Sequence, residues 1–90
     1  MEPMTPQTHV FVRLWEGSTA GTKGCFMDKE TGCIRRLKIR GEIMDFPFVN
    51  AATVRKIGYQ VIGGKARTAF LSKFGLMRDM DNMTVRRKKR

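Results

Sequence analysis

The first strong pattern along the chain is an alternation of apolar and polar positions over residues 9–15. Val10, Val12 and Leu14 occupy every second position, and the residues between them would point to the opposite face of an extended segment. A period of two is typical of a β-strand, because successive side chains leave opposite sides of the backbone. We therefore predict a strand over residues 9–15, followed by a loop of small residues over 16–21.

Two strand-forming stretches, residues 23–27 and 33–40, flank a segment with the chemistry of a tight turn. Asp28 can accept a hydrogen bond from a backbone N–H at the start of this turn. Gly32 can adopt the positive φ that closes a type I turn with a bulge. The pattern predicts a β-hairpin over residues 22–40.

The second arm of this hairpin has one apolar and one cationic face. Leu37 and Ile39 alternate with Arg36, Lys38 and Arg40. Three cations spaced two apart on a strand could line a phosphate backbone. The alternative is an exposed sheet edge that its charges protect from aggregation. The pattern alone leaves both interpretations open.

Helical signals occupy the second half of the chain. Asn50 is a good N-cap for a short helix over residues 51–57, and Gly58 can end it. A longer helix is predicted over residues 65–74, with Gly75 at its C-terminal cap. Its apolar stripe would consist of Ala66, Ala69, Phe70, Phe74 and, beyond the end, Met77.

Residues 59–62 suit a final strand, and residues 41–48 suit a short edge strand or a packed loop. Together the elements predict an α+β fold, in which a small antiparallel sheet of three to four strands packs against a C-terminal helix. The single compact domain would span residues 9–77. Residues 1–8 contain two prolines and would form a flexible leader, and residues 78–90 would form a disordered basic tail.

The composition agrees with one folded domain and adds a strong charge asymmetry. The 90 residues are 41% hydrophobic, which suits one small core rather than a disordered chain. Lys and Arg number 18 against 8 Asp and Glu, which gives a net charge of +10. Residues 1–33 carry a net −1 and residues 34–90 a net +11, so the second part should face a polyanion.

A basic surface is often only a solvated face, but this excess is large for so small a domain. Repulsion among the charges destabilises the compact state, and a bound phosphate backbone would relieve it. We therefore expect nucleic acid, DNA or RNA, as the partner. The expected contact residues are Arg13, Arg36, Lys38, Arg40, Arg55, Lys56, Lys65, Arg67, Lys73, Arg86, Arg87, Lys88, Lys89 and Arg90.

Two further features could add to such a site. Trp15 could stack on a base, although an aromatic residue on a strand more often packs in a core. Gly63 and Gly64 precede Lys65 and Arg67 at the start of the longer helix. Free N–H groups, two glycines and two cations make a candidate phosphate cradle, whose alternative is an ordinary flexible connector.

Residues suited to catalysis or metal binding are sparse. His9 is the sole histidine, Cys25 and Cys33 do not form a CxxC pair, and Asp79 and Asp81 fit solvated residues better than metal ligands. We expect no enzyme activity, no metal and no cofactor. Because no signal peptide or long apolar run is visible, we expect an intracellular, cytoplasmic protein with no membrane contact, nuclear if the host has a nucleus.

The sequence thus predicts a small non-enzymatic nucleic-acid-binding protein, of a kind that suits a viral or phage accessory protein. The alternative is an interaction module that docks on an acidic protein, as a regulator or inhibitor of host machinery or as a subunit of an assembly. Met77, Met80 and Met83 would then supply an adaptable apolar contact. Formation of a homo-oligomer through an exposed strand fits both hypotheses.

Overall fold

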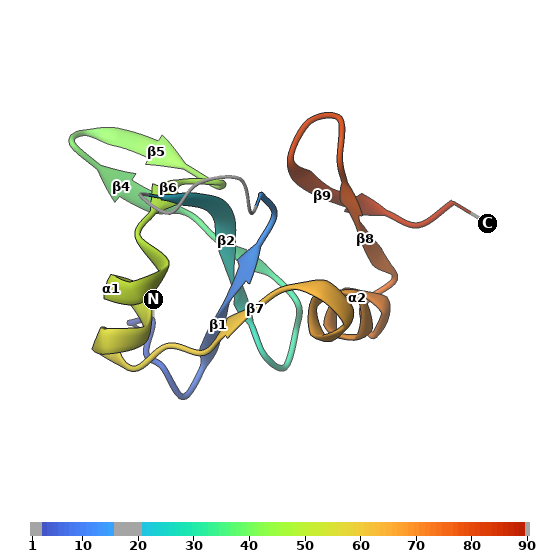
Figure 1. The fold of residues 1–90 in the computed structure, drawn as a ribbon, viewed down its shortest axis with the longest axis horizontal. Helices are drawn as coiled ribbons and strands as arrows, with labels where there is room; N and C mark the ends of the chain where they lie inside the picture. Colours follow the sequence, from blue (N-terminus) through green and yellow to red (C-terminus); the bar gives the residue numbers. More distant parts are fainter. Residues whose placement is uncertain (1–2, 16–20, 90) are drawn as a thin grey trace.

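An antiparallel pair of strands forms the centre of the fold (Figure 1). The computed structural model describes residues 3–15 and 21–89. Strand β1 (His9–Arg13) pairs along its whole length with β2 (Thr22–Asp28). The strand expected over residues 9–15 is confirmed over residues 9–13. Most of the loop expected after it lies outside the described residues.

Both faces of β1 are buried, and each face packs in a separate cluster of the hydrophobic core. Val10, Val12 and Leu14 lie in one buried cluster with Cys25 and Leu71, while Phe11 belongs to a second cluster. The second cluster also contains Phe26 and Val54, from β2 and the first helix. Alternation along β1 therefore separates two apolar faces rather than an apolar face from a wet one.

The sheet is larger than expected and mixed rather than antiparallel. Its strand order is β3 (Ile34–Arg35), β2, β1, β7 (Val61–Ile62), and β6 (Phe48–Val49) also pairs with β2. Strand β7 runs parallel to β1, with Phe11 opposite Val61. Parallel neighbours need a crossover connection, and the sequence pattern carries no information on strand direction. The prediction of three to four antiparallel strands was therefore wrong in this respect.

The turn between β2 and β3 follows the chemistry of its residues. The Asp28 carboxylate accepts hydrogen bonds from the backbone N–H groups of Glu30 at 2.8 Å and Thr31 at 3.1 Å. Gly32 adopts a φ of 74° and lies against the ring of Phe74, where a Cβ atom would clash. The predicted turn is confirmed. Both its conformation and its packing require glycine at position 32.

The second arm of the predicted hairpin divides in two. After β3, the chain leaves the sheet and forms a separate antiparallel hairpin from β4 (Leu37–Ile39) and β5 (Glu42–Met44). Pro47 is buried just before β6. Residues 41–48 therefore contribute to two short strands that pair with different neighbours.

Helix α1 (Ala51–Ile57) has the caps that its sequence predicts. The Asn50 side chain accepts hydrogen bonds from the backbone N–H groups of Ala52 and Thr53, at 2.9 and 3.2 Å. Gly58 closes the helix with a φ of 115°, in the left-handed region. Local side-chain chemistry fixes both ends of this helix.

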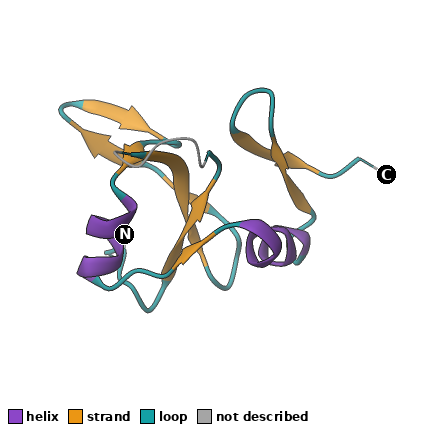
Figure 2. Ribbon diagram, viewed as in Figure 1, coloured by secondary structure: helices purple, strands orange, loops and turns teal. Residues whose placement is uncertain are grey.

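Helix α2 (Gly64–Ser72), one of the two helices coloured in Figure 2, buries a set of residues that differs in part from the one predicted. Its buried residues are Leu71 and Arg67, which are 1% and 6% exposed, whereas Ala66 and Ala69 are exposed. Two alanines bury little apolar area, and rotation of the helix brings the larger Leu71 side chain into the core. The expected apolar stripe is therefore only partly confirmed, because Phe70 packs against the first core cluster and Phe74 lies against Gly32, while the two alanines do not contribute to the core.

A second hairpin occupies the place of the predicted flexible tail. Strands β8 (Leu76–Asp79) and β9 (Thr84–Arg87) are antiparallel, and they lie beside α2 in Figure 1. Leu76 and Val85 pack against the first core cluster. The backbone N–H of Lys88 donates to the carbonyl oxygen of Gly75 at 2.9 Å. Apolar contacts and a backbone hydrogen bond thus connect this basic segment to the rest of the domain.

The described part of the N-terminal leader also makes contacts with the domain. Met4 packs against the second core cluster, and its carbonyl oxygen accepts a hydrogen bond from the Tyr59 hydroxyl at 3.3 Å. The Lys29 ammonium donates to the carbonyl oxygen of Pro6 at 3.0 Å. The segment expected to be flexible is therefore in contact with the domain from at least Met4 onward.

Taken together, the described residues form a small α+β domain with a mixed sheet and two helices. Their Cα radius of gyration is 12.5 Å, as expected for a compact chain of this size. Neither α1 nor α2 has the length and apolar character of a membrane-spanning helix.

Candidate nucleic-acid interface

The three cations of the predicted strand row lie on and around the β4–β5 hairpin. Arg36 precedes β4 and forms an ion pair with Asp45, with 3.4 Å between Nε and Oδ1. Lys38 is exposed within β4. Arg40 lies in the turn, with a φ of 51°, and is also exposed. The hairpin therefore presents all three side chains to solvent, but only Lys38 belongs to the regular strand.

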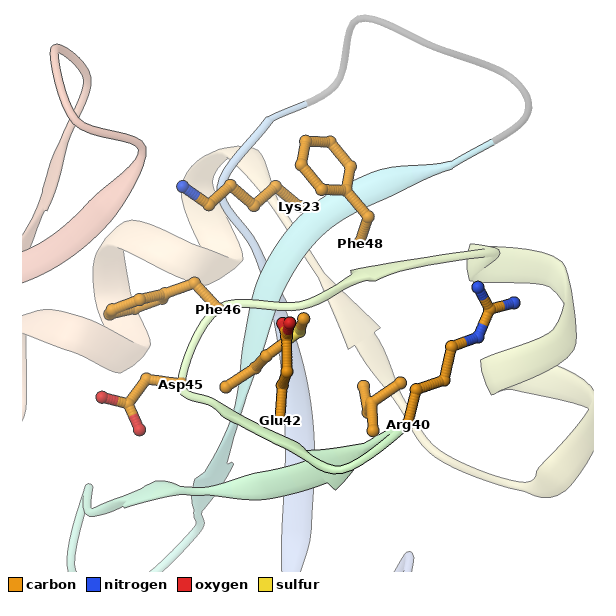
Figure 3. Close-up of a pocket in the computed structure, with 8 residues that line it drawn as sticks. Lys23, Arg40, Glu42, Asp45, Phe46 and Phe48 are labelled. Atoms are coloured by element: carbon orange, nitrogen blue, oxygen red, sulfur yellow. The ribbon is translucent and has the colours of Figure 1, made fainter.

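A groove of about 820 Å³ separates this hairpin from β2 and β6 (Figure 3). Figure 3 shows Asp45 and Arg40 at opposite ends of the groove, with Glu42 between them. Lys23 and Phe48 contribute from β2 and β6. Charged groups of both signs line the groove, so it is not an anion-selective site.

An aromatic pair lies at the edge of this groove. Trp15 is half-buried and packs edge-to-face against Phe48, with 5.8 Å between ring centroids and 81° between ring planes. Phe48 is 62% exposed and is therefore the more accessible aromatic surface. Sequence reasoning selected Trp15 and missed Phe48, because Pro47 left the strand assignment of that segment open.

The cations of α1 lie at its C-terminal end. Arg55 and Lys56 are exposed in the last turn, where positive charge is favoured by the helix dipole. Ile57, the next residue, is 64% exposed. This end of α1 therefore combines two cations with an uncovered apolar side chain.

The predicted phosphate cradle is only partly present. Gly63 is the N-cap of α2 and has no side chain to cap it, and Gly64 has a φ of 55°. Lys65 is exposed beside them, as expected. Arg67, however, is directed into the protein and donates from Nη1 to the carbonyl oxygen of Arg13 at 2.9 Å. The cradle therefore retains one of its two predicted cations.

Arg13 is also less accessible than predicted. Its side chain is half-buried, and its Nε atom is buried without a hydrogen-bond partner among the described residues. The residue lies at the end of β1, where its carbonyl oxygen accepts the bond from Arg67. Arg13 and Arg67 thus help to hold the fold together at this point, rather than extending into solvent.

The basic C-terminal run lies on an ordered support. Arg86 and Arg87 are exposed on β9, and the Nε atom of Arg86 is 3.9 Å from an Asp79 oxygen. The Lys88 ammonium donates to the Ser72 hydroxyl at 2.8 Å. Lys89 is exposed, and Arg90 lies outside the described residues. Strand β9 therefore positions the backbone from which Arg86 and Arg87 extend into solvent.

Lys73 lies at the other end of α2 and completes the cationic side chains of that helix. Its ammonium group is 5.7 Å from the ring centroids of both Phe70 and Phe74. The two rings pack edge-to-face against each other. These cation–π contacts hold Lys73 near the surface while leaving it exposed.

The histidine and the two cysteines of the described region are candidate reactive groups. Burial lowers the pKa of His9, and its Nδ1 atom lies 2.6 Å from the Thr8 hydroxyl. Burial also raises the pKa of the Cys25 thiol to about 12, which makes it a poor nucleophile. Cys33 is an exposed free thiol. No group of three potential metal ligands occurs among the residues that the structure describes.

The pair Asp79 and Asp81 forms part of a turn. The Asp79 carboxylate accepts hydrogen bonds from the backbone N–H groups of Asp81 and Asn82 and from the Asn82 side chain, at 3.0–3.2 Å. The Asn82 side-chain bond is the largest cause that lowers the pKa of Asp79. This carboxylate therefore stabilises the β8–β9 turn.

No protein-family model, curated protein or solved structure matches the chain. The exposed cations of the predicted contact set are Arg36, Lys38, Arg40, Arg55, Lys56, Lys65, Lys73, Arg86, Arg87, Lys88 and Lys89.

Proposed function

We propose that this protein is a non-enzymatic nucleic-acid-binding protein that contacts phosphates through its exposed cations. The observation that carries the proposal is the position of Arg86 and Arg87 on β9, in a hairpin whose apolar residues pack on the core. Cations on an ordered strand lose less conformational freedom on binding than cations on a free tail. The basic C-terminal segment can therefore act as a defined binding surface.

The distribution of the other exposed cations supports the same proposal. Lys38 and Arg40 lie on the β4–β5 hairpin, and Arg55 and Lys56 lie on α1. Phosphate contacts of this kind give affinity and position but not sequence specificity. We therefore expect binding that is broad in sequence, to DNA, RNA or both.

A salt titration of fluorescent single- and double-stranded DNA and RNA tests this proposal. Log affinity falls with log salt in proportion to the number of phosphates neutralised, by about 0.9 per contact on duplex DNA and about 0.7 on single strands. If β9 contacts the backbone, Arg86→Gln/Arg87→Gln should reduce the slope by between about one and two units. The full-length chain is the right form, because truncation within β9 would remove its ordered strand.

A control variant with one charge removed tests whether the loss of positive charge by itself changes the slope. Lys29→Gln removes a positive charge whose ammonium is already bonded to Pro6. This variant should retain a slope close to that of the unaltered protein once circular dichroism shows that it is folded. Equal slopes for the double variant and the unaltered protein would contradict the role of β9. An absence of oligonucleotide binding above that of a basic peptide would reject the proposal itself.

A protein partner is the second candidate, and the groove of Figure 3 favours it. Phe48, which is 62% exposed, brings apolar surface to the groove together with Ile39 and Met44, and charges of both signs also line it. Such a surface suits a partner with apolar and charged side chains better than it suits a polyanion. The edge strands β3 and β7 are two residues long, which gives self-association through a strand few backbone groups to use.

The cysteines fit a reducing compartment. Cys25 is buried and Cys33 exposed, and both are free thiols. An exposed free thiol persists in the reducing cytosol or nucleus more readily than in an oxidising compartment. We therefore propose an intracellular site of action, where nucleic acid is available.

A further inference from the structure

One wall of the groove in Figure 3 places an exposed aromatic ring beside a cation. Phe48 on β6 lies directly opposite Lys23 on β2 in the antiparallel register, so their side chains leave the sheet on the same face. The Phe48 side chain is 62% exposed, and the Trp15 ring packs against it with 5.8 Å between centroids. The groove therefore has an aromatic surface that is held in position before any ligand binds.

The facing wall is the β4–β5 hairpin, which supplies charges of both signs. Arg40 lies in the turn of this hairpin and is exposed. Glu42 begins β5, and in Figure 3 its side chain extends toward the wall that carries Phe48. Asp45 forms an ion pair with Arg36, whereas Glu42 has no ion pair with another described residue. Glu42 is therefore the groove carboxylate that can accept hydrogen bonds from a ligand.

A neutral aromatic group suits this lining better than a phosphate does. The carboxylates of the groove would repel a phosphate, but an unpaired base is uncharged and presents an aromatic face with donors and acceptors at its edge. Ile39 and Met44 add apolar surface, and the volume of about 820 Å³ is within the roughly 300–1,000 Å³ of small-ligand sites. Lys23 and Arg40 lie on opposite walls, where they can contact the phosphates that flank the base. Lys23 is held only by a long bond to the Asn82 carbonyl, at 3.4 Å, which a phosphate can replace.

We infer that this groove binds one unpaired guanine of a single-stranded nucleic acid, stacked on Phe48 and hydrogen-bonded to Glu42. The inference rests on the proposed nucleic-acid binding and adds the type of strand and the base. Guanine presents the N1–H and N2–H donors side by side, which matches the two acceptor oxygens of a carboxylate. Each of the other bases places an acceptor beside its donor on this edge, and a carboxylate repels that acceptor. In a duplex, pairing and stacking cover this edge and the base faces, so only an unpaired base can enter.

The first test compares one sequence as a single strand and as a duplex. Phe48→Ala removes the stacking surface and should weaken binding of the full-length protein to the single strand about tenfold, which is within the range for one stacked base. The affinity for the duplex should change by less than about twofold, because duplex binding depends on phosphate contacts. Phe48→Tyr retains the ring and should retain single-strand binding. Equal losses for the single strand and the duplex would overturn the inference.

A matched control variant shortens another exposed apolar side chain. Ile57 is 64% exposed, close to the value for Phe48, and it does not line the groove. Ile57→Ala should therefore leave the affinities for the single strand and the duplex unchanged. Circular dichroism of all variants confirms that they are folded. A loss of single-strand affinity in Ile57→Ala as large as that in Phe48→Ala would overturn the placement of the base in the groove.

The second test changes one base in an otherwise constant single strand. An oligothymidine with one central guanine should bind about tenfold tighter than the same strand with adenine, which is within the range of one bidentate contact to a base. Hypoxanthine lacks the N2 amino group and should give an intermediate affinity. Glu42→Gln should abolish the preference for guanine, whereas Glu30→Gln makes the same change in charge outside the groove and should retain it. Equal affinities of the unaltered protein for guanine and adenine would overturn the inference while leaving the proposed function standing.

Trp15 supplies a spectroscopic readout at the same site. It is the single tryptophan of the chain and its ring contacts Phe48, so a base stacked on Phe48 should change its emission. The change should saturate with the guanine strand and be absent with the duplex. If Phe48→Ala and Glu42→Gln bind the guanine strand as tightly as the unaltered protein does, the inference is overturned and the groove is left to a protein partner. Absence of binding to every oligonucleotide would overturn the proposed function as well.

Discussion

Arg67 on α2 donates a hydrogen bond to the carbonyl oxygen of Arg13 at the end of β1, across 54 positions of sequence. The adjacent carbonyl, that of Leu14, accepts a longer bond from Arg78 on β8. The end of the central strand is therefore tied both to the second helix and to the C-terminal hairpin. Two arginines expected from the sequence to be free for ligands, or to lie in a flexible tail, connect distant parts of the fold.

Replacing Arg67 should destabilise the protein more than it weakens any phosphate contact on the surface. Arg67→Ala removes a buried side chain and leaves the Arg13 carbonyl without this donor, so the free energy of unfolding should fall by about 2–4 kcal/mol. Lys65→Ala, on the exposed part of the same helix, should change it by less than about 0.5 kcal/mol. Urea denaturation measures both. Equal effects would contradict the buried position of Arg67.

The cap of α1 gives a second test of stability. Asn50→Ala removes the acceptor of two backbone N–H groups and should lower the free energy of unfolding by about 1 kcal/mol. Asn50→Asp retains the acceptor and should preserve most of the stability. Thermal unfolding of the two variants measures the difference. An alanine variant as stable as the aspartate variant would show that the cap contributes nothing to the fold.

Stability should fall as the pH is lowered through the ordinary range of histidine. Burial lowers the pKa of His9 in the folded protein, so the unfolded chain binds a proton first as the pH drops below about 6.5. The contribution of neutral His9 is complete above that pH and is lost as the pH falls toward the lowered pKa of the folded state. Denaturation curves between about pH 7.5 and 5.5 measure this slope.

The variant His9→Gln isolates the contribution of this one residue. Glutamine does not titrate, so the variant should lose the part of the slope between about pH 7.5 and 5.5 that comes from His9. Asp28 and Asp79 do not complicate this window, because hydrogen bonds lower the pKa values of both carboxylates further. An unchanged slope in the variant would show that another group is responsible.

The two thiols should react at very different rates. Cys33 is exposed, whereas Cys25 is buried opposite Val12 and has a pKa raised to about 12. A thiol-specific chromogenic reagent should therefore titrate one cysteine quickly in the native protein and the second only after denaturant is added. Cys33→Ser should abolish the fast phase. Two fast phases in the native protein would contradict the packing of β2.

Local chemistry made part of the fold predictable from the sequence. The Asp28 turn and the Asn50 cap depend on hydrogen bonds between residues two or three positions apart. The residue types at these positions are therefore enough to predict both features. The glycines that close these elements, Gly32 and Gly58, have the expected positive φ values. Each of these features is complete within a few residues.

Features that depend on distant contacts were not predictable. The apolar stripe of α2 gave no reason to bury Arg67, because its acceptor is a carbonyl on β1. The β8–β9 hairpin depends on the packing of Leu76 and Val85 against the first core cluster. The sequence around these two residues does not show that such a contact forms. The parallel direction of β7 likewise depends on the position of β1.

The candidate site follows the same division. The exposure of Lys38, Arg55 and Lys65 was predictable, because charged side chains on short elements rarely have room to be buried. The contact of the Lys88 ammonium with the Ser72 hydroxyl was not, because the sequence predicts a flexible tail for Lys88 and a solvated helix face for Ser72. Only the packing of the β8–β9 hairpin beside α2 brings these two residues together.

The position of β1 between β2 and β7 also constrains how the chain folds during synthesis. Phe11 pairs with Val61, 50 positions later, so the central strand cannot complete its hydrogen bonding until most of the chain has left the ribosome. Contacts of such high sequence separation slow folding. In the nascent chain, the β1–β2 hairpin therefore has one edge of β1 unpaired. Pairing of β7 with β1 then protects that edge from pairing with other chains.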